Sequence, residues 1–141
     1  MMFEVACEVA APLEGVWAWW TDFGSPGDEL RVSHGLGASR RRVLEAAPGR
    51  VVFEDRTPLG TVRRTVRLQP GHRFLETGEG AQSFESEWRF EATPAGGTRV
   101  TRSMRVRAAA ALRPAARLVT WMDLRHHCRE AERDLRGSRG A

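Results

Sequence analysis

Residues 84–106, FESEWRFEATPAGGTRVTRSMRV, carry the clearest structural signal in this sequence. Apolar residues alternate with charged or polar ones on both sides of the turn-forming segment TPAGG. An alternation of period two is typical of a strand with one buried face, and Pro and Gly between two such runs favour a hairpin. We therefore predict two antiparallel strands, at residues 82–92 and 98–108.

Further strands are predicted upstream, where turn residues recur about every ten residues. The turns contain Pro and Gly, as at Pro48-Gly49 and Pro70-Gly71, and the segments between them have period-two runs. The additional strands are expected at residues 3–9, 39–46, 50–57, 61–68 and 72–77. The sequence thus predicts a sheet of seven antiparallel strands.

Helices are expected at both ends of this strand-rich region. Pro12 suits the first turn of a helix, and the residues that follow it place Leu13, Val16, Trp17 and Trp20 on one face. A second short helix is predicted at residues 28–34.

A long helix is predicted at residues 114–135, with a frayed tail at residues 136–141. Its apolar stripe consists of Leu118, Trp121, Leu124, Cys128, Ala131 and Leu135. No linker divides the chain, so we expect one domain over residues 1–141. The apolar face of the sheet has to be covered, and this helix is the only element large enough to cover it. A curved sheet around one helix leaves a pocket, closed at one end by the short helices.

Two motifs carry a family resemblance: VAAPLEGVWAWWTDF at residues 9–23 and SEWRFEATPAGGTRVTRSMRV at residues 86–106. In this order and spacing the chain resembles the START-like (SRPBCC) superfamily of polyketide cyclases, lipid-transfer domains and pollen allergens, over nearly its whole length. The resemblance implies an α+β helix-grip fold, a curved antiparallel sheet around a long C-terminal helix. It also implies a lipid-like or polyketide-like ligand. The tyrosine that is frequent in the family's pockets is missing, since the chain has no Tyr.

The basic residues of the chain bear on whether it binds nucleic acid. The 141 residues have a net charge of +4, but the chain lacks Lys, Ile, Asn and Tyr, so all 22 basic residues are Arg. This pattern fits a high-GC bacterial genome, and the basic runs at residues 40–42 and 63–64 have no adjacent aromatic residues for base stacking. We therefore predict no nucleic-acid partner.

The sequence shows no signal for export or for membrane insertion. The N-terminus lacks the basic and apolar regions of a signal peptide, and no apolar run approaches the roughly 20 residues of a membrane span. We expect a cytoplasmic protein without membrane insertion, in which Cys7 and Cys128 are reduced.

Strand parity predicts which polar residues face the pocket. Arg64, Arg102 and Asp55 alternate with apolar neighbours, so they either satisfy one another as an internal ion network or orient a ligand oxygen. Glu76 faces inward or outward, because Phe74 and Leu75 compete for the inner face. If it faces inward, it is a candidate general base.

The other expected pocket residues are mainly aromatic. The predicted ligand-binding set is Trp17, Trp20, Phe53, Ser86, Trp88, Arg102, Met104 and Trp121, and the candidate catalytic set is Arg64, Arg102, Asp55 and Glu76. Trp19 lies off the apolar stripe of its helix, which places it at the pocket mouth or at a dimer contact.

The histidines do not suggest a metal centre. His34 is expected as a solvated loop residue near the pocket entrance. His126 and His127 are adjacent on a helix and point about 100° apart, so they cannot chelate one metal as an i, i+4 pair does. We predict no metal and no cofactor.

Three functions follow from these expectations. The first is binding of a small hydrophobic molecule, lipid-like or polyketide-like, between the sheet and the long helix. The second is a polyketide cyclase or dehydratase that uses acid/base catalysis and arginine-stabilised enolates. The third is a protein-interaction module, and a homodimer is compatible with all three.

Overall fold

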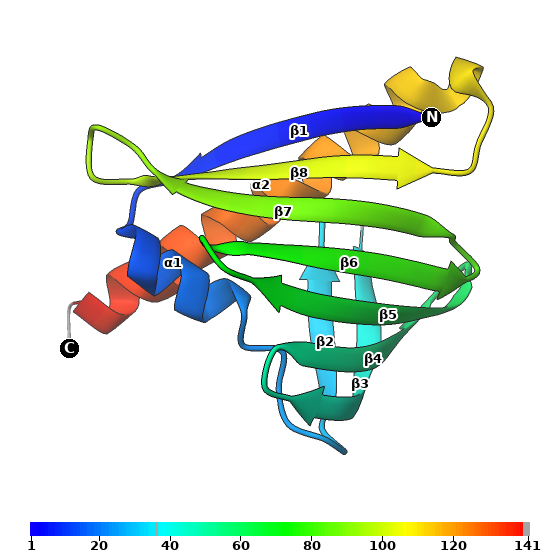
Figure 1. The fold of residues 1–141 in the computed structure, drawn as a ribbon, viewed down its shortest axis with the longest axis horizontal. Coiled ribbons are helices and arrows are strands. Elements are labelled where there is room, and N and C mark those ends of the chain that lie inside the picture. The colour runs from blue at the N-terminus through cyan, green and yellow to red at the C-terminus, as the bar shows by residue number, and fades with distance from the viewer. Residues whose placement is uncertain (36, 140–141) are drawn as a thin grey trace.

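The computed structural model describes residues 1–35 and 37–139. Within these residues, eight strands form one antiparallel sheet in the order β1-β8-β7-β6-β5-β4-β3-β2, accompanied by two α-helices and a short 3-10 helix (Figure 1). The elements are β1 (Met2–Val9), α1 (Leu13–Trp20), β2 (Glu29–His34), β3 (Gly37–Ala47), β4 (Arg50–Thr57), β5 (Gly60–Gln69), β6 (Arg73–Gly80), β7 (Phe84–Ala92), β8 (Thr98–Val106), η1 (Ala110–Leu112) and α2 (Arg113–Arg139).

The β7–β8 hairpin confirms the alternation from which it was predicted. Phe84 pairs with Val106, Trp88 with Arg102, and Ala92 with Thr98, without a bulge. Every second residue of β7 from Phe84 to Phe90 is buried, whereas its charged neighbours are not. The expected helix-grip fold is therefore present, and its register places Trp88 and Arg102 on the same inner face.

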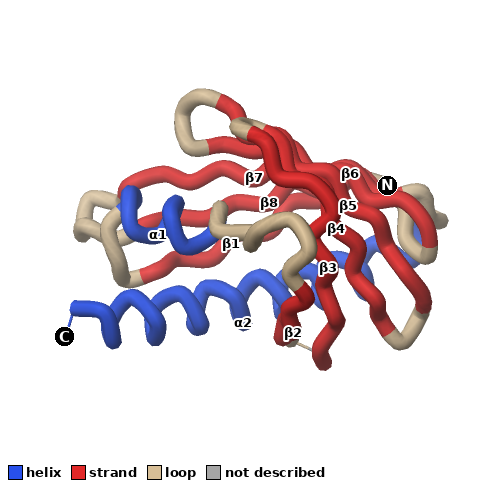
Figure 2. The backbone as a smooth tube through the Cα atoms, turned by 90° about the horizontal axis from the view of Figure 1, so that it is seen from below, coloured by secondary structure: helices blue, strands red, loops and turns tan. Residues whose placement is uncertain are grey.

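The sheet is strongly curved, and both α-helices lie on its inner side. In Figure 1, β2 and β3 run nearly across the direction of β6 to β8. Figure 2 shows α1 and α2 on the same side of the sheet, with β2 and β3 bending round toward α2. The curvature leaves room between the helices and the inner face of the sheet.

Two expectations about secondary structure are corrected. The segment predicted as a second short helix is the edge strand β2. It pairs with β3, with Glu29 opposite Arg42 at one end and His34 opposite Gly37 at the other. The sheet therefore has eight strands rather than seven. Its residues alternate, with Leu30, Val32 and His34 on one face, a signal too short to separate a strand from a helix. The long helix also continues through Arg139, and residues 140–141 of the expected frayed tail lie outside the described residues.

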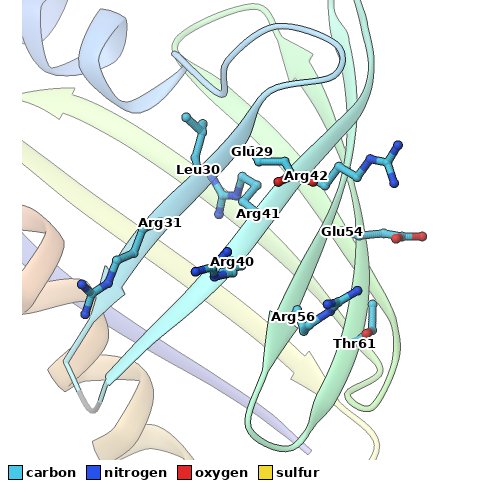
Figure 3. Close-up of a pocket in the computed structure, with 9 residues that line it drawn as sticks. All are labelled: Glu29, Leu30, Arg31, Arg40, Arg41, Arg42, Glu54, Arg56 and Thr61. Atoms are coloured by element: carbon cyan, nitrogen blue, oxygen red, sulfur yellow. The ribbon is translucent and has the colours of Figure 1, made fainter.

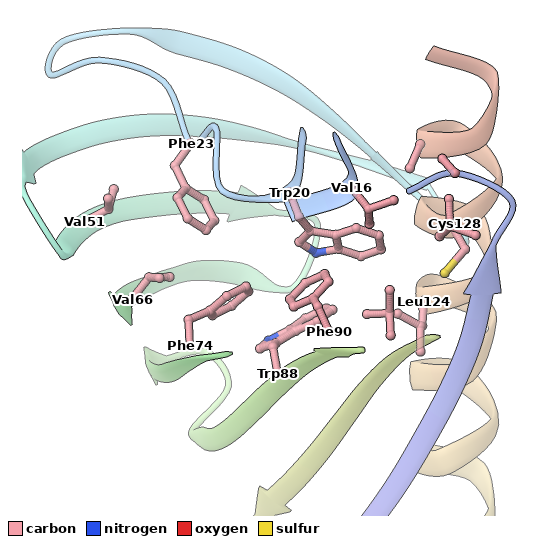
Figure 4. Close-up of a cluster of buried hydrophobic side chains, with 14 of the residues drawn as sticks. Val16, Trp20, Phe23, Val51, Val66, Phe74, Trp88, Phe90, Leu124 and Cys128 are labelled. Carbon is pink, nitrogen blue, oxygen red and sulfur yellow. The ribbon is translucent and has the colours of Figure 1, made fainter. Parts of the chain in front are cut away.

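The main core lies where α1 and α2 meet the sheet (Figure 4). Val16 and Trp20 of α1 and Leu124 and Cys128 of α2 are at most 9% exposed, in agreement with their apolar stripes. Leu118, at the start of the α2 stripe, is 56% exposed, so only the later turns of that stripe are covered. Among the described residues, no helix is long and apolar enough to span a membrane.

Candidate functional site

A cavity of about 440 Å³ lies between the inner face of the sheet, α1, β2 and α2. Its volume falls within the range typical of small-molecule sites, roughly 300–1,000 Å³. All elements except β1 and η1 contribute a residue to its wall, because the curved sheet surrounds it. Chain segments far apart in the sequence thus share one concave surface.

Aromatic rings form much of the cavity wall, and Figure 4 shows several of them around the same space. Phe74 stacks on Trp88 with ring centroids 5.4 Å apart, and Phe23 stacks on Phe53 at 5.7 Å. Trp20 of α1 lies 5.7 Å from Trp88, which connects the helix to the sheet. These contacts fix the rings and provide a largely preformed apolar surface.

Glu76 is the centre of a charged group in the same wall. It faces inward, is 5% exposed, and accepts hydrogen bonds from Arg64 (3.2 Å) and Arg102 (3.1 Å). Ser86 Oγ and Trp88 Nε1 also donate to its Oε1, each at 3.2 Å. The alternation on β5 to β8 places all five side chains on one face of adjacent strands.

The electrostatics of this group keep Glu76 ionised. Burial alone raises the pKa of its carboxyl, but the charges of Arg64 and Arg102 and the hydrogen bond from Trp88 outweigh burial and lower the pKa from 4.5 to about 2. Burial lowers the pKa of Arg102, and Glu76 opposes that effect, whereas the pKa of Arg64 is raised by Glu76 and Asp55 despite burial. The ion pairs with the two guanidinium groups thus decide the shifts of Glu76 and Arg64, whereas burial decides that of Arg102.

Asp55 extends the group behind the cavity wall. Its carboxylate is fully buried and lies 3.1 Å from Arg64 Nε, without the alignment of a hydrogen bond. Arg41 of β3 donates to both oxygens of Asp55, at 3.0 and 3.3 Å, and its guanidinium lies 4.0 Å above the Phe53 ring. Of the internal ion network expected among Arg64, Arg102 and Asp55, the contact between Arg64 and Asp55 is present, and Arg102 is connected to it through Glu76.

A second polar cluster faces the cavity from α2 and β2. Asp123 Oδ1 lies 3.1 Å from His34 Nδ1 and 3.5 Å from His127 Nε2. His34 Nε2 lies 2.8 Å from the hydroxyl of the buried Ser39. Burial raises the pKa of Asp123, but the hydrogen bonds and charge of His127 and the hydrogen bond with His34 outweigh it, so the pKa is held well below its usual value.

Most of the candidate residues lie at or directly behind the cavity wall. The wall includes Trp20, Phe53, Arg64, Glu76, Trp88 and Arg102. Ser86 and Asp55 are buried behind it and bind its charged residues. Trp19 also lines the cavity, and its Nε1 donates to Asp134 on α2 at 3.0 Å. Whether these residues bind a ligand or catalyse a reaction stays a prediction.

Three expected ligand-binding residues lie elsewhere. Trp17 does not line the cavity and packs edge-on against His72 and Phe90. Met104 belongs to a separate apolar cluster. On β8, Arg102 lines the cavity and Met104 does not. Trp121, 37% exposed, lines a groove beside β1.

The error at Trp121 comes from the orientation of α2. Its apolar stripe packs against the core and β1, whereas its polar face, with Asp123, His127 and Glu130, lines the cavity. Asp123 follows Trp121 by two residues, about 200° around the helix axis. The i, i+4, i+7 spacing of these three polar residues in the sequence indicates a polar face of the helix, and this signal could have identified them. His34 was expected near the pocket entrance and lines the cavity, but it ends the strand β2 rather than standing in a loop, and its contact with Asp123 was not predicted.

A second depression lies on the outer side of the curved sheet, along β2 to β5 (Figure 3). Its lining includes the exposed residues Arg31, Arg40, Arg42, Arg56 and Glu29 and the half-buried Glu54. Arg41 belongs to the same basic run, but alternation turns its side chain inward to Asp55. The run at residues 40–42 is thus divided between the two faces of the sheet.

We compare the chain with three solved structures that have the same fold. The protein TTHA0849 from Thermus thermophilus is 14% identical with a TM-score of 0.69, and the match covers 98% of this chain and 99% of that one. The Zhui aromatase/cyclase from a Streptomyces strain is 20% identical with a TM-score of 0.67, covering 98% and 97%. The di-domain aromatase/cyclase StfQ of the steffimycin pathway is 19% identical with a TM-score of 0.58, covering 95% of this chain and 46% of StfQ.

These likenesses establish the fold, and the sequence itself establishes the family. No curated protein matches the chain. The family model described as polyketide cyclase / dehydrase and lipid transport matches residues 2–132, which is nearly the whole chain. Together with the curved sheet, the long helix and the cavity between them, this match shows that the chain belongs to the polyketide cyclase / dehydrase and lipid transport family.

Proposed function

We propose that this protein binds a small, mainly apolar molecule with a carbonyl or carboxylate oxygen in the cavity between the sheet and α2. The observation that carries the proposal is that Arg64 and Arg102 line a cavity otherwise rich in aromatic rings. Aromatic walls favour burial of apolar surface, and a few fixed polar groups orient the ligand. Membership of the family and likeness to aromatase/cyclases support a polyketide-like or lipid-like skeleton.

The ion network supports this role rather than competing with it. A guanidinium group has five N–H donors in a fixed plane. Within the described part of the chain, Arg102 uses two of them, toward Ser86 at 3.4 Å and Glu76 at 3.1 Å. The network therefore holds Arg102 in place, and its remaining donors suit a ligand oxygen.

The test begins with native mass spectrometry of freshly purified protein, which detects a co-purifying small molecule. Binding of the apolar dye 1-anilinonaphthalene-8-sulfonate (ANS) is then compared between two variants. Val32→Trp fills the cavity from β2, whereas Val119→Trp adds the same side chain to an exposed position of α2 outside the cavity. We expect dye binding to fall at least about tenfold in Val32→Trp only, which corresponds to about 1.4 kcal/mol. Equal binding by both variants would exclude the cavity as the binding site.

A cyclase or dehydratase is the second candidate, and the convergence of two arginines on one part of the wall favours it. Guanidinium groups fixed in a largely buried site stabilise a developing enolate without reorganising. Glu76 is a weak base there, since its pKa is about 2 and its oxygens accept four hydrogen bonds. Asp55 is fully buried behind the wall. Incubation with a synthetic β-polyketone, followed by mass spectrometry for loss of water, tests this role. Aldol cyclisation alone keeps the mass but changes the chromatographic retention time, so a substrate unchanged in both mass and retention time would argue for binding alone.

A further inference from the structure

We propose that His34, Asp123 and His127 form a binding site for one divalent transition-metal ion at the cavity wall. These residues come from β2 and α2, two elements that are far apart in the sequence, and all three line the cavity. Their ligand atoms, His34 Nδ1, Asp123 Oδ1 and His127 Nε2, are those that face one another. One ligand atom from each of the three residues lies within 4.8 Å of those of the other two.

The separations fit a common metal ion. With bonds of about 2.1 Å, two ligand atoms lie about 3.0 Å apart in an octahedral site and about 3.4 Å apart in a tetrahedral one. The observed distances from Asp123 Oδ1 are 3.1 Å to His34 and 3.5 Å to His127. Both distances from the carboxylate match one ion, and side-chain rotation has to bring only the two histidine nitrogens, which lie within 4.8 Å, to the same separation.

The backbone after β2 lies very close to the backbone of α2. A Cβ atom at Gly35 would lie 2.9 Å from the carbonyl oxygen of Met122 and 3.2 Å from the amide nitrogen of Asp123. Only a residue without a side chain lets the turn after β2 come this close to the helix. Gly35 thus allows His34 to contact Asp123.

Ser39 provides the outer support that metal-binding histidines usually have. Its hydroxyl lies 2.8 Å from His34 Nε2 and is buried. When Nε2–H donates to this hydroxyl, Nδ1 carries the lone pair that a metal needs. The second ring nitrogen is therefore held in place by a group that does not compete for the ion.

The charges around the cavity permit a cation. Four arginines line it: Arg31 is exposed, and Arg41, Arg64 and Arg102 contact the buried carboxylates of Asp55 and Glu76 at 3.0–3.2 Å. The carboxylates of Asp22 and Asp123 in the same wall supply two further negative charges. Glu130 adds a negative charge to the same face of α2, near His127. Two imidazoles and one carboxylate form a ligand set that suits Zn²⁺, Fe²⁺ and Co²⁺ and leaves coordination positions open. Because the three residues line the cavity, we expect the open coordination positions of the metal to face the cavity.

The proposal stands on the geometry of the three ligands and does not depend on the proposed ligand of the cavity. If the cavity binds a molecule with a carbonyl oxygen, a metal at its wall would polarise that oxygen as a Lewis acid. The adjacent His126 contacts Ser33 and Glu130 instead, which makes it the natural control.

The experiment uses the whole chain, purified without a histidine tag and treated with a chelator. Co²⁺ is titrated by isothermal calorimetry and by visible absorption, and Zn²⁺ affinity is measured by competition. We expect one equivalent of Co²⁺ with a ligand-field spectrum. We expect His34→Gln and His127→Gln to weaken binding at least about 100-fold, Ser39→Ala about 10- to 100-fold, and His126→Gln less than about twofold.

Several outcomes would overturn the proposal. These are no stoichiometric Co²⁺ binding by the wild type, undiminished binding by His34→Gln, or equal losses in His34→Gln and His126→Gln. Circular dichroism checks that each variant folds, and the wild-type titration decides the question if a variant does not. ANS binding to the metal-free wild type separates this test from that of the proposed function. Dye binding without Co²⁺ binding rejects only the metal site, and the reverse rejects only the apolar ligand.

Discussion

Replacing Glu76 by Gln tests the electrostatic account of the cavity wall most directly. The substitution keeps the size of the side chain but removes the charge that balances Arg64 and Arg102, and it turns an amide N–H toward cationic groups. Removing one partner of a buried ion pair typically destabilises a protein by about 3–5 kcal/mol. The pKa of Glu76 gives a similar figure: a decrease from 4.5 to about 2 corresponds to about 3 kcal/mol at pH 7.

The pH dependence has a defined sign. Because the pKa is lower in the folded state, the ionised carboxylate stabilises the folded protein above pH 4.5, and this stabilisation is lost as the pH falls toward 2. The difference in unfolding free energy between wild type and Glu76→Gln should therefore shrink from about 3 kcal/mol at pH 7 to about half of that at pH 3. Other titrating groups are common to both proteins and cancel in the difference.

Urea unfolding followed by tryptophan fluorescence at both pH values measures this difference. Glu79→Gln is the matched control, since Glu79 lies on the same strand but is exposed, and the change should stay within about 0.5 kcal/mol. A difference between wild type and Glu76→Gln that is the same at pH 7 and pH 3 would refute the account. It would mean that the charge of Glu76 does not stabilise the fold.

Three further predictions concern other parts of the molecule. Arg102→Met should weaken binding of a co-purifying ligand by about 1.5–3 kcal/mol, and an unchanged ligand-induced shift in Tm would refute a binding role for this arginine. Gly78→Ala should destabilise the protein by about 1–3 kcal/mol in urea unfolding, because the added Cβ overlaps the Phe84 ring; a neutral effect would show that the ring moves aside freely. Cys7 should react with iodoacetamide at a rate that rises around pH 7, since a hydrogen bond with Cys128 lowers its pKa to about 7. In Cys128→Ala that rise should move to higher pH, and an unmoved profile would exclude the contact as its cause.

The sequence by itself determined the local elements whose pattern is strong and unbroken. The β7–β8 hairpin was predictable because its alternation sets both strands and its Pro-Gly segment sets the turn. The buried positions of α1 and of the later turns of α2 followed from helical spacing. Parity also indicated correctly that Arg102 and Asp55 face inward, because it depends only on neighbours within one strand.

Tertiary structure alone decided what the polar residues meet. Residues 29–34 form a strand because β3 supplies a pairing edge, which a six-residue pattern cannot reveal. Glu76 faces inward because the register of β6 between β5 and β7 opposes it to Val66 and Ser86. His34 contacts Asp123, 89 residues away, through the curvature of the sheet and the rotation of α2 about its axis. Curvature, register and helix rotation depend on contacts between distant segments, and local periodicity carries no information about them.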